Sequence, residues 1–228
     1  MRYWTWAEIR TKIEEDLDLE DEDFVRPNEL LAYANEAIDE AEAEIHSIYE
    51  DYFLARGVLT LVQNEDEIDM PTDIYANKVR RLVYDNGSKV YEIERLKDWR
   101  KFEEYSVQKN YGAGDTYAYF PVNSTPGSPQ ILLVPKARES GAVGYIWYLR
   151  NANRLVDDDD ICDIPEFVSF ILQHMKVRIY EKEGHPNIDK AMADLEQQRS
   201  QMTSTLTAMV PDANNELEMD TSSYEEMS

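Results

Sequence analysis

The chain has a single cysteine, only eight glycines and about half as many basic as acidic residues. Its 228 residues contain 23 Lys and Arg against 47 Asp and Glu, which gives a net charge of −24. The lone Cys162 excludes an intramolecular disulfide and a multi-cysteine zinc site. The negative charge opposes tight binding to a nucleic-acid backbone. Because no run approaches ~18 apolar residues, the sequence also predicts no membrane partner.

Motifs that carry out catalysis are missing as well. The sequence contains neither a phosphate-binding glycine loop nor a His-Glu-x-x-His zinc motif. Its three histidines, His46, His174 and His185, are far apart in sequence, and we predict a structural role for each. Acidic neighbours such as Asp163 are expected to raise the pKa of the Cys162 thiol, which is the wrong direction for a nucleophile. We therefore predict no enzyme, no catalytic residue and no cofactor.

Apolar residues make up 43% of the chain, which is sufficient for a sizeable core. In the first part of the sequence they recur with helical spacing. Thr5 and Glu8 have the spacing of a capping box, which predicts a first helix over 5–18. Apolar residues at every third or fourth position predict a long second helix over 28–54. The opposite face of this second helix is acidic, and we interpret it as facing solvent: Glu36, Asp39, Glu40, Glu42 and Glu44.

At Gly57 the apolar period changes from that of a helix to that of strands. Short runs rich in β-branched and aromatic residues predict strands over 58–62, 67–71, 79–84, 89–93, 117–120, 130–135 and 143–148. The first two runs are predicted to form a hairpin, and the next two a second hairpin around the Asn86-Gly87 turn. A short helix over 96–105 bridges strands. The sequence thus predicts a compact antiparallel β module.

The helical period returns after the aspartate run 157–160. It predicts helices over 165–184 and 186–209, followed by a tail that is disordered unless a partner holds it. The predicted fold class is α+β, with an antiparallel helix bundle built from the N- and C-terminal helices, an inserted antiparallel β module and an extended C-terminal tail. The predicted divisions of the chain are 1–56, 57–150, 151–209 and 210–228.

Two acidic runs have some features of metal sites. Residues 18–29 match a calcium loop at Asp18, Glu20, Glu22, Val25 and Glu29. Asp23 occupies the sixth position, where the loop needs glycine, and Pro27 stiffens its end. The run 157–160, with Asp163, is explained more simply as a solvated linker that places acids before a helix N-terminus. We therefore predict no metal site at either run.

One window of the chain is basic. Residues 78–101 contain eight basic residues against four acids, a net charge of +4. Interleaved aromatic residues would allow contact with nucleic acid. Pairing with acids of the same chain or of an adjacent copy is the favoured alternative, because the rest of the chain supplies many acids. The candidate inter-subunit basic patch is Lys78, Arg80, Arg81, Arg95 and Arg100.

The first half of the chain also contains several recognisable segments. Trp6-Ala7-Glu8-Ile9-Arg10 is followed by an acidic gap and then by Glu29-Leu30-Leu31-Ala32-Tyr33-Ala34-Asn35-Glu36-Ala37. Leu59-Thr60-Leu61-Val62 is followed by Ile68-Asp69-Met70-Pro71-Thr72-Asp73, ahead of the strand over 79–84. Over about residues 4–105, this combination resembles the head-to-tail adaptor, or connector, proteins of tailed bacteriophages.

The resemblance implies a virion structural protein assembled in the host cytoplasm. Such adaptors form a ring, commonly of twelve copies, beneath the portal protein; tail or nozzle proteins attach below, and DNA passes through the lumen without specific binding. Their C-terminal segments often reach into the portal, which here indicates the apolar residues Leu217, Met219, Tyr224 and Met227. Two alternatives stay open: an acidic regulatory or calcium-binding interaction module with its site at 18–29, and another tail or baseplate component.

Overall fold

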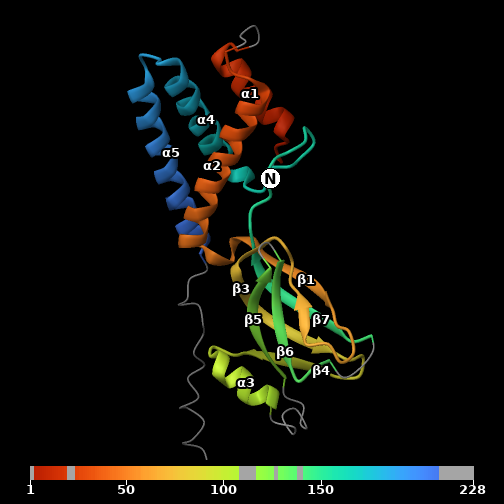
Figure 1. Ribbon diagram of the computed structural model, residues 1–228. Helices are drawn as coiled ribbons and strands as arrows, with labels where there is room; N and C mark the ends of the chain where they lie inside the picture. The colour runs from red at the N-terminus through yellow and green to blue at the C-terminus, as the bar shows by residue number, and fades with distance from the viewer. Residues whose placement is uncertain (1–2, 20–23, 108–116, 126–127, 138–140, 211–228) are drawn as a thin grey trace, which may run out of the picture. The chain divides into compact units, whose positions relative to one another are not determined.

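The chain divides into two compact units. The computed structural model describes residues 3–19, 24–107, 117–125, 128–137 and 141–210. We call residues 1–49 together with 154–228 the helical unit, and residues 50–153 the β unit. The β unit is therefore inserted in sequence between the two halves of the helical unit, and both units are coloured along the chain in Figure 1.

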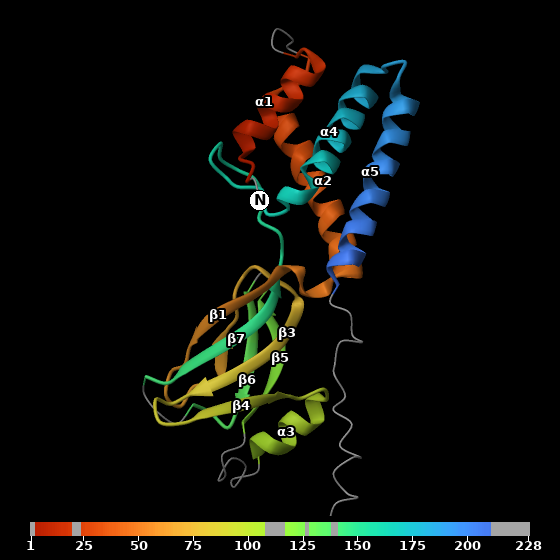
Figure 2. The ribbon, with the colours of Figure 1, turned by 180° about the vertical axis from the view of Figure 1, so that it is seen from behind.

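The helical unit brings helices from both ends of the chain together. Its helices are α1 (Trp6–Leu17), α2 (Pro27–Ile48), α4 (Val168–Glu183), which follows the short 3₁₀ helix η2 (Pro165–Phe167), and α5 (Ile188–Met209). Helix α4 contacts α1, α2 and α5, and the two opposite views of Figures 1 and 2 show α4 and α5 side by side. The predicted packing of N-terminal against C-terminal helices therefore occurs.

Local signals fix the ends of these helices. The Glu8 amide donates to the Thr5 hydroxyl at 3.3 Å, and the Thr5 amide donates to the Glu8 carboxylate at 3.0 Å. This reciprocal pair is the predicted capping box. Gly184 ends α4 in the left-handed region, at φ 69°, where glycine has no steric penalty.

The predicted apolar stripes form the core of the helical unit. Its fully buried side chains come from all four helices and include Ile9, Ile13, Leu30, Ile38, Ile45, Phe170, Ile171, Met175 and Leu206. The stripe on α5 is only partly covered, because Met192 on the same helix remains 45% exposed. The 3.6-residue period thus correctly identified the buried faces of α2 and α4.

The β unit is a curled sheet of seven strands. The strands are β1 (Leu54–Thr60), β2 (Glu67–Asp69), β3 (Ile74–Asp85), β4 (Val90–Arg95), β5 (Tyr117–Thr125), β6 (Ser128–Val134) and β7 (Val143–Arg150). Their order across the sheet is β1-β7-β3-β4-β5-β6-β2. The fold is therefore α+β, as predicted, with β1 and β2 as the two edge strands.

The predicted hairpin of 58–62 with 67–71 is wrong. Strand β1 pairs with β7 along its whole length, from Leu54 opposite Leu149 to Thr60 opposite Val143, and β2 pairs with β6. Strand β7 gives all seven residues of β1 a partner, whereas β2 has only three residues to offer. The second predicted hairpin, β3 with β4, is confirmed around the Asn86-Gly87 turn.

The prediction of a purely antiparallel module is also wrong. Strands β4 and β5 run parallel, with Ile93 opposite Tyr117 and Arg95 opposite Tyr119. A parallel pair needs a long crossover connection, and the chain between these strands contains helix α3 (Trp99–Val107). The bridging helix was predicted, but its consequence for strand direction was not.

The second helix is shorter than predicted. It ends at Ile48, residues 50–53 form the 3₁₀ helix η1 (Glu50–Phe53), and β1 starts at Leu54. The carboxylates of Glu50 and Asp51 bind basic side chains on β3, which holds this segment against the sheet. Tyr49 and Tyr52 continue the helical spacing of apolar residues beyond Ile48, but the contacts with β3 determine the structure of this segment.

Tyrosines form a cluster within the mainly aliphatic core of the β unit. The rings of Tyr84 and Tyr117 stack at 4.6 Å, and Tyr91 packs against both. The Tyr148 hydroxyl donates to Asp73 at 3.0 Å. Burial, together with this bond, raises the pKa of Tyr148 to about 12. A smaller cluster joins Phe102 of α3 to Ala118 and Val134 of the sheet.

Candidate interaction surfaces

Three of the five predicted patch residues pair with carboxylates of the chain: Lys78 and Arg80 with the 3₁₀ helix η1, and Arg81 with Glu92 of β4. Lys78 and Arg80 both bind the carboxylate of Glu50, and Arg80 Nε donates to Asp51 at 2.7 Å. Hydrogen bonds from Lys78 and Arg80 lower the pKa of Glu50. Their side chains are about 40% exposed, so these pairs add little stability but neutralise the charge locally.

A groove between β3, β4 and β5 brings three of the five predicted residues together. Arg80, Arg81 and Arg95 line it beside Tyr117 and Tyr119, and its volume is about 450 Å³. The groove exists because β3 pairs with β4 only over 83–85 and 90–92, after which β4 turns to pair with β5.

The groove is not strongly basic. It is also lined by Glu92 and Glu94, and the Arg81 guanidinium lies 3.4 Å from the Glu92 carboxylate. Arg100 lies outside the groove, as an exposed residue of α3. The basic window is thus spread over three environments, and its charge is partly balanced by carboxylates of the same chain, in line with the favoured alternative.

An arginine that the sequence patterns do not single out lies on the exposed face of the sheet. Arg56 of β1 places its guanidinium 4.5 Å from the ring centre of Tyr145 and 5.3 Å from that of Trp147, both on β7. Arg81 of β3 approaches Trp147 from the other side, at 5.7 Å. Cation–π contacts of this kind hold guanidinium groups flat on a surface. The only local signal was the alternation of Leu54, Arg56 and Val58.

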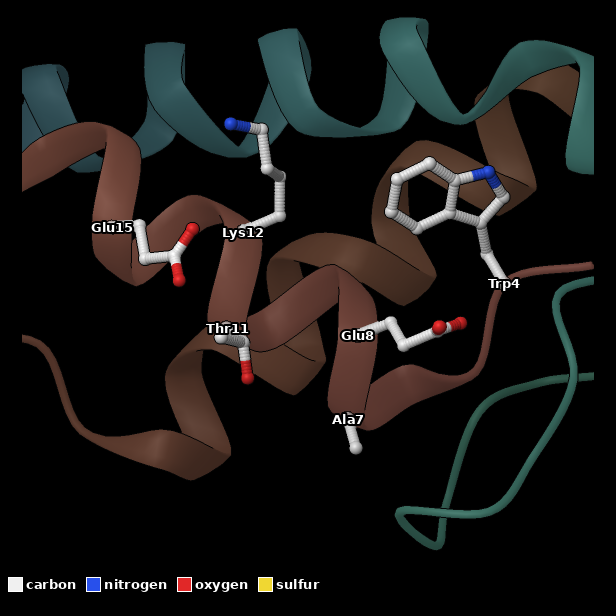
Figure 3. Close-up of a pocket in the computed structure, with 6 residues that line it drawn as sticks. All are labelled: Trp4, Ala7, Glu8, Thr11, Lys12 and Glu15. Carbon is white, nitrogen blue, oxygen red and sulfur yellow. The ribbon is translucent and has the colours of Figure 1, made fainter.

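A second groove lies on the outer side of α1 (Figure 3). Its volume is about 470 Å³, and it is lined by Trp4, Ala7, Glu8, Thr11, Lys12 and Glu15. Five of these residues belong to α1, while Trp4 precedes the helix. The Lys12 ammonium bonds to Asp16 at 2.6 Å, which raises the pKa of Lys12. The groove is open to solvent, and its polar groups are the carboxylates of Glu8 and Glu15, the Thr11 hydroxyl and the paired Lys12.

The acidic face of α2 was predicted to face solvent, but most of its carboxylates bind side chains of neighbouring segments. Glu36 pairs with Arg178 of α4, and Glu40 pairs with Arg199 of α5. Asp39 bonds to Arg154 at 2.6 Å, Glu44 to Thr203 at 2.5 Å and Glu29 to Lys182 at 2.8 Å. These carboxylates therefore link α2 to its neighbours within the helical unit, a use that sequence spacing alone does not reveal.

The aspartate run 157–160 organises a turn against α1. The Asp160 carboxylate accepts from the amides of Val156 and Asp157 at 2.7 and 2.8 Å, and these bonds lower its pKa. Asp158 binds the Arg10 guanidinium of α1 through both carboxylate oxygens. Backbone bonds from Trp6 to Asp160 and from Cys162 to Trp4 complete the junction.

We predict that Asp160→Ala lowers the melting temperature by a few degrees at pH 7. The folded-state pKa of this carboxyl is depressed, so its contribution is present above the unfolded-state value of about 3.9 and is lost as pH falls through the folded-state pKa. The difference between mutant and wild type, followed by thermal circular dichroism, should therefore shrink below about pH 4. Asp159→Ala, an exposed neighbour, is the control; an equal effect of both would contradict this role.

Comparison with known families assigns the chain. The family model for the SU10 adaptor protein matches residues 4–220. The chain belongs to the SU10 adaptor protein family. A comparison with curated proteins gives no match. The match extends well past the resemblance that the sequence segments carried, which covered about residues 4–105, and it includes the whole β unit and helices α4 and α5.

Membership gives this adaptor protein its broad role. A phage adaptor is a structural, non-enzymatic protein of the virion, and it contacts head or tail components. Over the residues described by the structure, no helix is both long and apolar enough to span a membrane.

The cysteine and the three histidines of the adaptor are buried or packed against neighbouring side chains. Cys162 is buried; burial first, and then Asp163, raise the pKa of its thiol to about 11. His174 is buried on α4 near Glu40, and burial lowers its pKa. His46 is buried on α2, and His185 stacks on Tyr180 at 4.1 Å.

In the structure of the adaptor, one of the proposed calcium ligands, Glu29, is bound to other groups of the chain. The Glu29 carboxylate, which would hold the twelfth position, accepts from the Arg26 amide and from Lys182, and these bonds lower its pKa. Glu20, Glu22 and Asp23 lie outside the described residues. Across the described ranges, no group of three or more metal-binding side chains is present.

The predicted portal-binding residues also lie outside the described part of the adaptor. Leu217, Met219, Tyr224 and Met227 all follow Val210, the last residue that the structure describes. The family match reaches residue 220, so the first part of this segment belongs to the length that the family shares.

Proposed function

We propose that this adaptor forms an oligomeric ring at the head–tail junction of a tailed phage, joining the portal to the tail. The match to the SU10 adaptor protein over residues 4–220 carries the proposal. It is supported by the segments 6–10 and 29–37, which resemble those of connector proteins and lie on α1 and α2. Another tail or baseplate component with the same plan is the remaining alternative.

The ring would have the portal on one side and tail or nozzle proteins on the other, with DNA passing through its lumen. We propose twelve copies, assembled in the host cytoplasm and incorporated into the virion. A net charge of −24 suits this task, because an acidic wall repels the phosphate backbone and lets DNA slide past without specific binding.

Within each copy, we propose a division of labour among the segments 1–56, 57–150, 151–209 and 210–228. Helices α1, α2, α4 and α5 would form an antiparallel bundle that carries the β unit. The C-terminal segment would bind the portal through Leu217, Met219, Tyr224 and Met227. The basic residues Lys78, Arg80, Arg81, Arg95 and Arg100 would contribute to contacts between copies, although Lys78, Arg80 and Arg81 also pair with carboxylates of their own chain.

The test is to mix the full-length chain with purified portal and examine the product. We expect a stoichiometric ring complex by multi-angle light scattering, visible as a ring beneath the portal in electron micrographs. The free chain alone decides nothing, because an adaptor can remain monomeric until it meets its portal. Binding to isolated tail or baseplate proteins but not to portal would contradict the proposal.

A further inference from the structure

The outer face of the curled sheet carries two arginines on either side of a tryptophan. Strands β1, β7 and β3 lie side by side (Figure 2), with Arg56 opposite Trp147 and Trp147 opposite Arg81. In the next row along these strands, Val58 lies opposite Tyr145. We call these five residues the arginine–aromatic face. It is accessible to solvent, because Val58 is 67% exposed and the Arg81 side chain 56%.

Aromatic rings hold both guanidinium groups in place. Arg56 lies 4.5 Å from the ring centre of Tyr145 and 5.3 Å from that of Trp147. Arg81 approaches Trp147 at 5.7 Å and also pairs with Glu92 at 3.4 Å, whereas Arg56 forms no ion pair with any carboxylate that the structure describes. A guanidinium binds a carboxylate through two parallel hydrogen bonds. Arg56 is therefore preorganised for a carboxylate from outside the sheet.

The face also has the composition of a protein interface. Tyrosine, tryptophan and arginine dominate binding energy at such interfaces, and Leu54 and Val58 of β1 add apolar surface that is 48% and 67% exposed. Neither β1 nor β7 contains an acidic residue, although the chain has 47 of them. The face therefore fits a partner segment that combines acids with apolar side chains.

The longest acidic segment of the chain begins at the C-terminal end of α1. Residues 14–23 contain eight acids. Of the four that the structure describes, Asp16 bonds to a lysine at 2.6 Å, while Glu14, Glu15 and Asp18 form no ion pair. The last turn of α1 has no basic residue, so these carboxylates lie at the negative end of the helix dipole and repel one another. Binding to a guanidinium would relieve that repulsion.

We propose that the arginine–aromatic face of one copy binds the acidic end of α1, residues 14–19, in a second copy. Acids of this segment pair with Arg56, while Leu17 and Leu19, which are only partly buried, contact the aromatic rings. Two different surfaces then meet, which is a heterologous contact of the kind that generates a ring when the rotation closes. The inference rests on the proposed ring and names an interface for it.

Other occupants fit this face less well. DNA would bring its phosphates close to a chain of net charge −24, which opposes binding. The carboxylates of α2 already pair with basic residues of the helical unit. The acids that follow Val210 belong to the segment proposed to bind the portal. The end of α1 is the acidic segment whose described carboxylates still lack basic partners.

Disulfide trapping between copies tests the contact directly. Val58→Cys and Glu15→Cys are made as separate full-length variants and mixed under mild oxidation, with portal and, at high concentration, without it. We expect a dimer that contains one chain of each variant, and no comparable dimer from either variant alone. The native Cys162 is buried and does not compete. Ser88→Cys, in the exposed β3–β4 turn, replaces Val58→Cys as control; trapping no stronger than this control would overturn the proposal.

A charge exchange provides the second measurement. Arg56→Glu in the Val58→Cys chain should reduce the trapped dimer by about tenfold. Glu14→Arg together with Asp18→Arg in the Glu15→Cys chain should restore it. Lys101→Glu, on exposed α3, makes the same charge change elsewhere and should have no effect, and circular dichroism checks that each variant folds. Loss without restoration would refute the pairing of Arg56 with the acidic end of α1.

Two further results would assign the face to a different occupant and overturn the proposal. Retention of a DNA duplex at low salt that Arg56→Glu abolishes would indicate nucleic acid. Trapping of Val58→Cys by Glu225→Cys more strongly than by Glu15→Cys would indicate the C-terminal segment. Portal complexes that form without the trapped contact would refute this interface alone, whereas a trapped contact without portal binding would refute the proposed function alone.

Discussion

Truncation after Val210 is expected to leave the adaptor folded and to abolish its complex with portal. Helix α5 ends at Met209, and its buried anchors Met202 and Leu206 lie upstream of the cut. All the buried side chains that the structure describes therefore remain in the truncated chain. The removed segment contains the four apolar residues proposed to bind the portal, and an extended segment that orders on binding contributes affinity only in the complex.

The measurements are a thermal unfolding curve and co-sedimentation with portal. The curve should match that of the full chain, while the portal complex should fall below detection. Two full-length variants that keep the charge of this segment test whether binding depends on its apolar residues and on their order. Replacing Leu217, Met219, Tyr224 and Met227 together with alanine should reproduce the loss, and a shuffled segment of the same composition should fail as well. A truncated chain that assembles normally would sink the proposed role of this segment.

Phe170→Ala is expected to cost about 3–5 kcal/mol of the free energy of unfolding of the helical unit. Phe170 lies on α4, the helix that contacts α1, α2 and α5, and its side chain is 1% exposed. Removing the ring leaves a cavity that three neighbouring helices cannot all fill, because a movement toward one opens a gap to another.

Urea unfolding followed by far-ultraviolet circular dichroism, which reports the helices, measures this cost. Val156→Ala serves as the control, because Val156 is apolar but 67% exposed and should change stability by no more than about 0.5 kcal/mol. A loss of under ~1 kcal/mol for Phe170→Ala would mean that the site collapses freely around the deletion. That result would contradict a core fixed by contacts from several helices.

The helices were predictable because their signals are local. The Thr5 capping box, the stripe from Leu30 to Ile45 and the Gly184 stop each depend on residues within a few positions, and the structure contains all three. The end of α2 was not predictable in this way. Residues 50–53 leave the helix because Glu50 and Asp51 bind Lys78 and Arg80, and a contact over such a separation leaves no mark in the local period.

The sheet shows the same limit more strongly. Strands adjacent in sequence were expected to pair, which holds for β3 with β4 but fails for β1, whose partner β7 follows five other strands. The prediction of the candidate basic patch met the same limit. Charges that cluster in sequence from Lys78 to Arg100 separate in space, while Arg56 joins Arg81 across Trp147. Pairing partners depend on the whole topology, which short patterns do not encode.

The insertion of the β unit within the helical unit sets an order for folding during synthesis. Helices α1 and α2 leave the ribosome first, but the apolar stripes of both pack against helices that follow residue 153. At ordinary translation speeds, the roughly 100 intervening residues take about 5–20 s to appear. The β unit is synthesised before helices α4 and α5, so it can fold while the helical unit is still incomplete. The nascent chain therefore exposes Ile9, Ile13, Ile38 and Ile45 for many seconds, which makes these two helices natural targets for chaperones that act during translation.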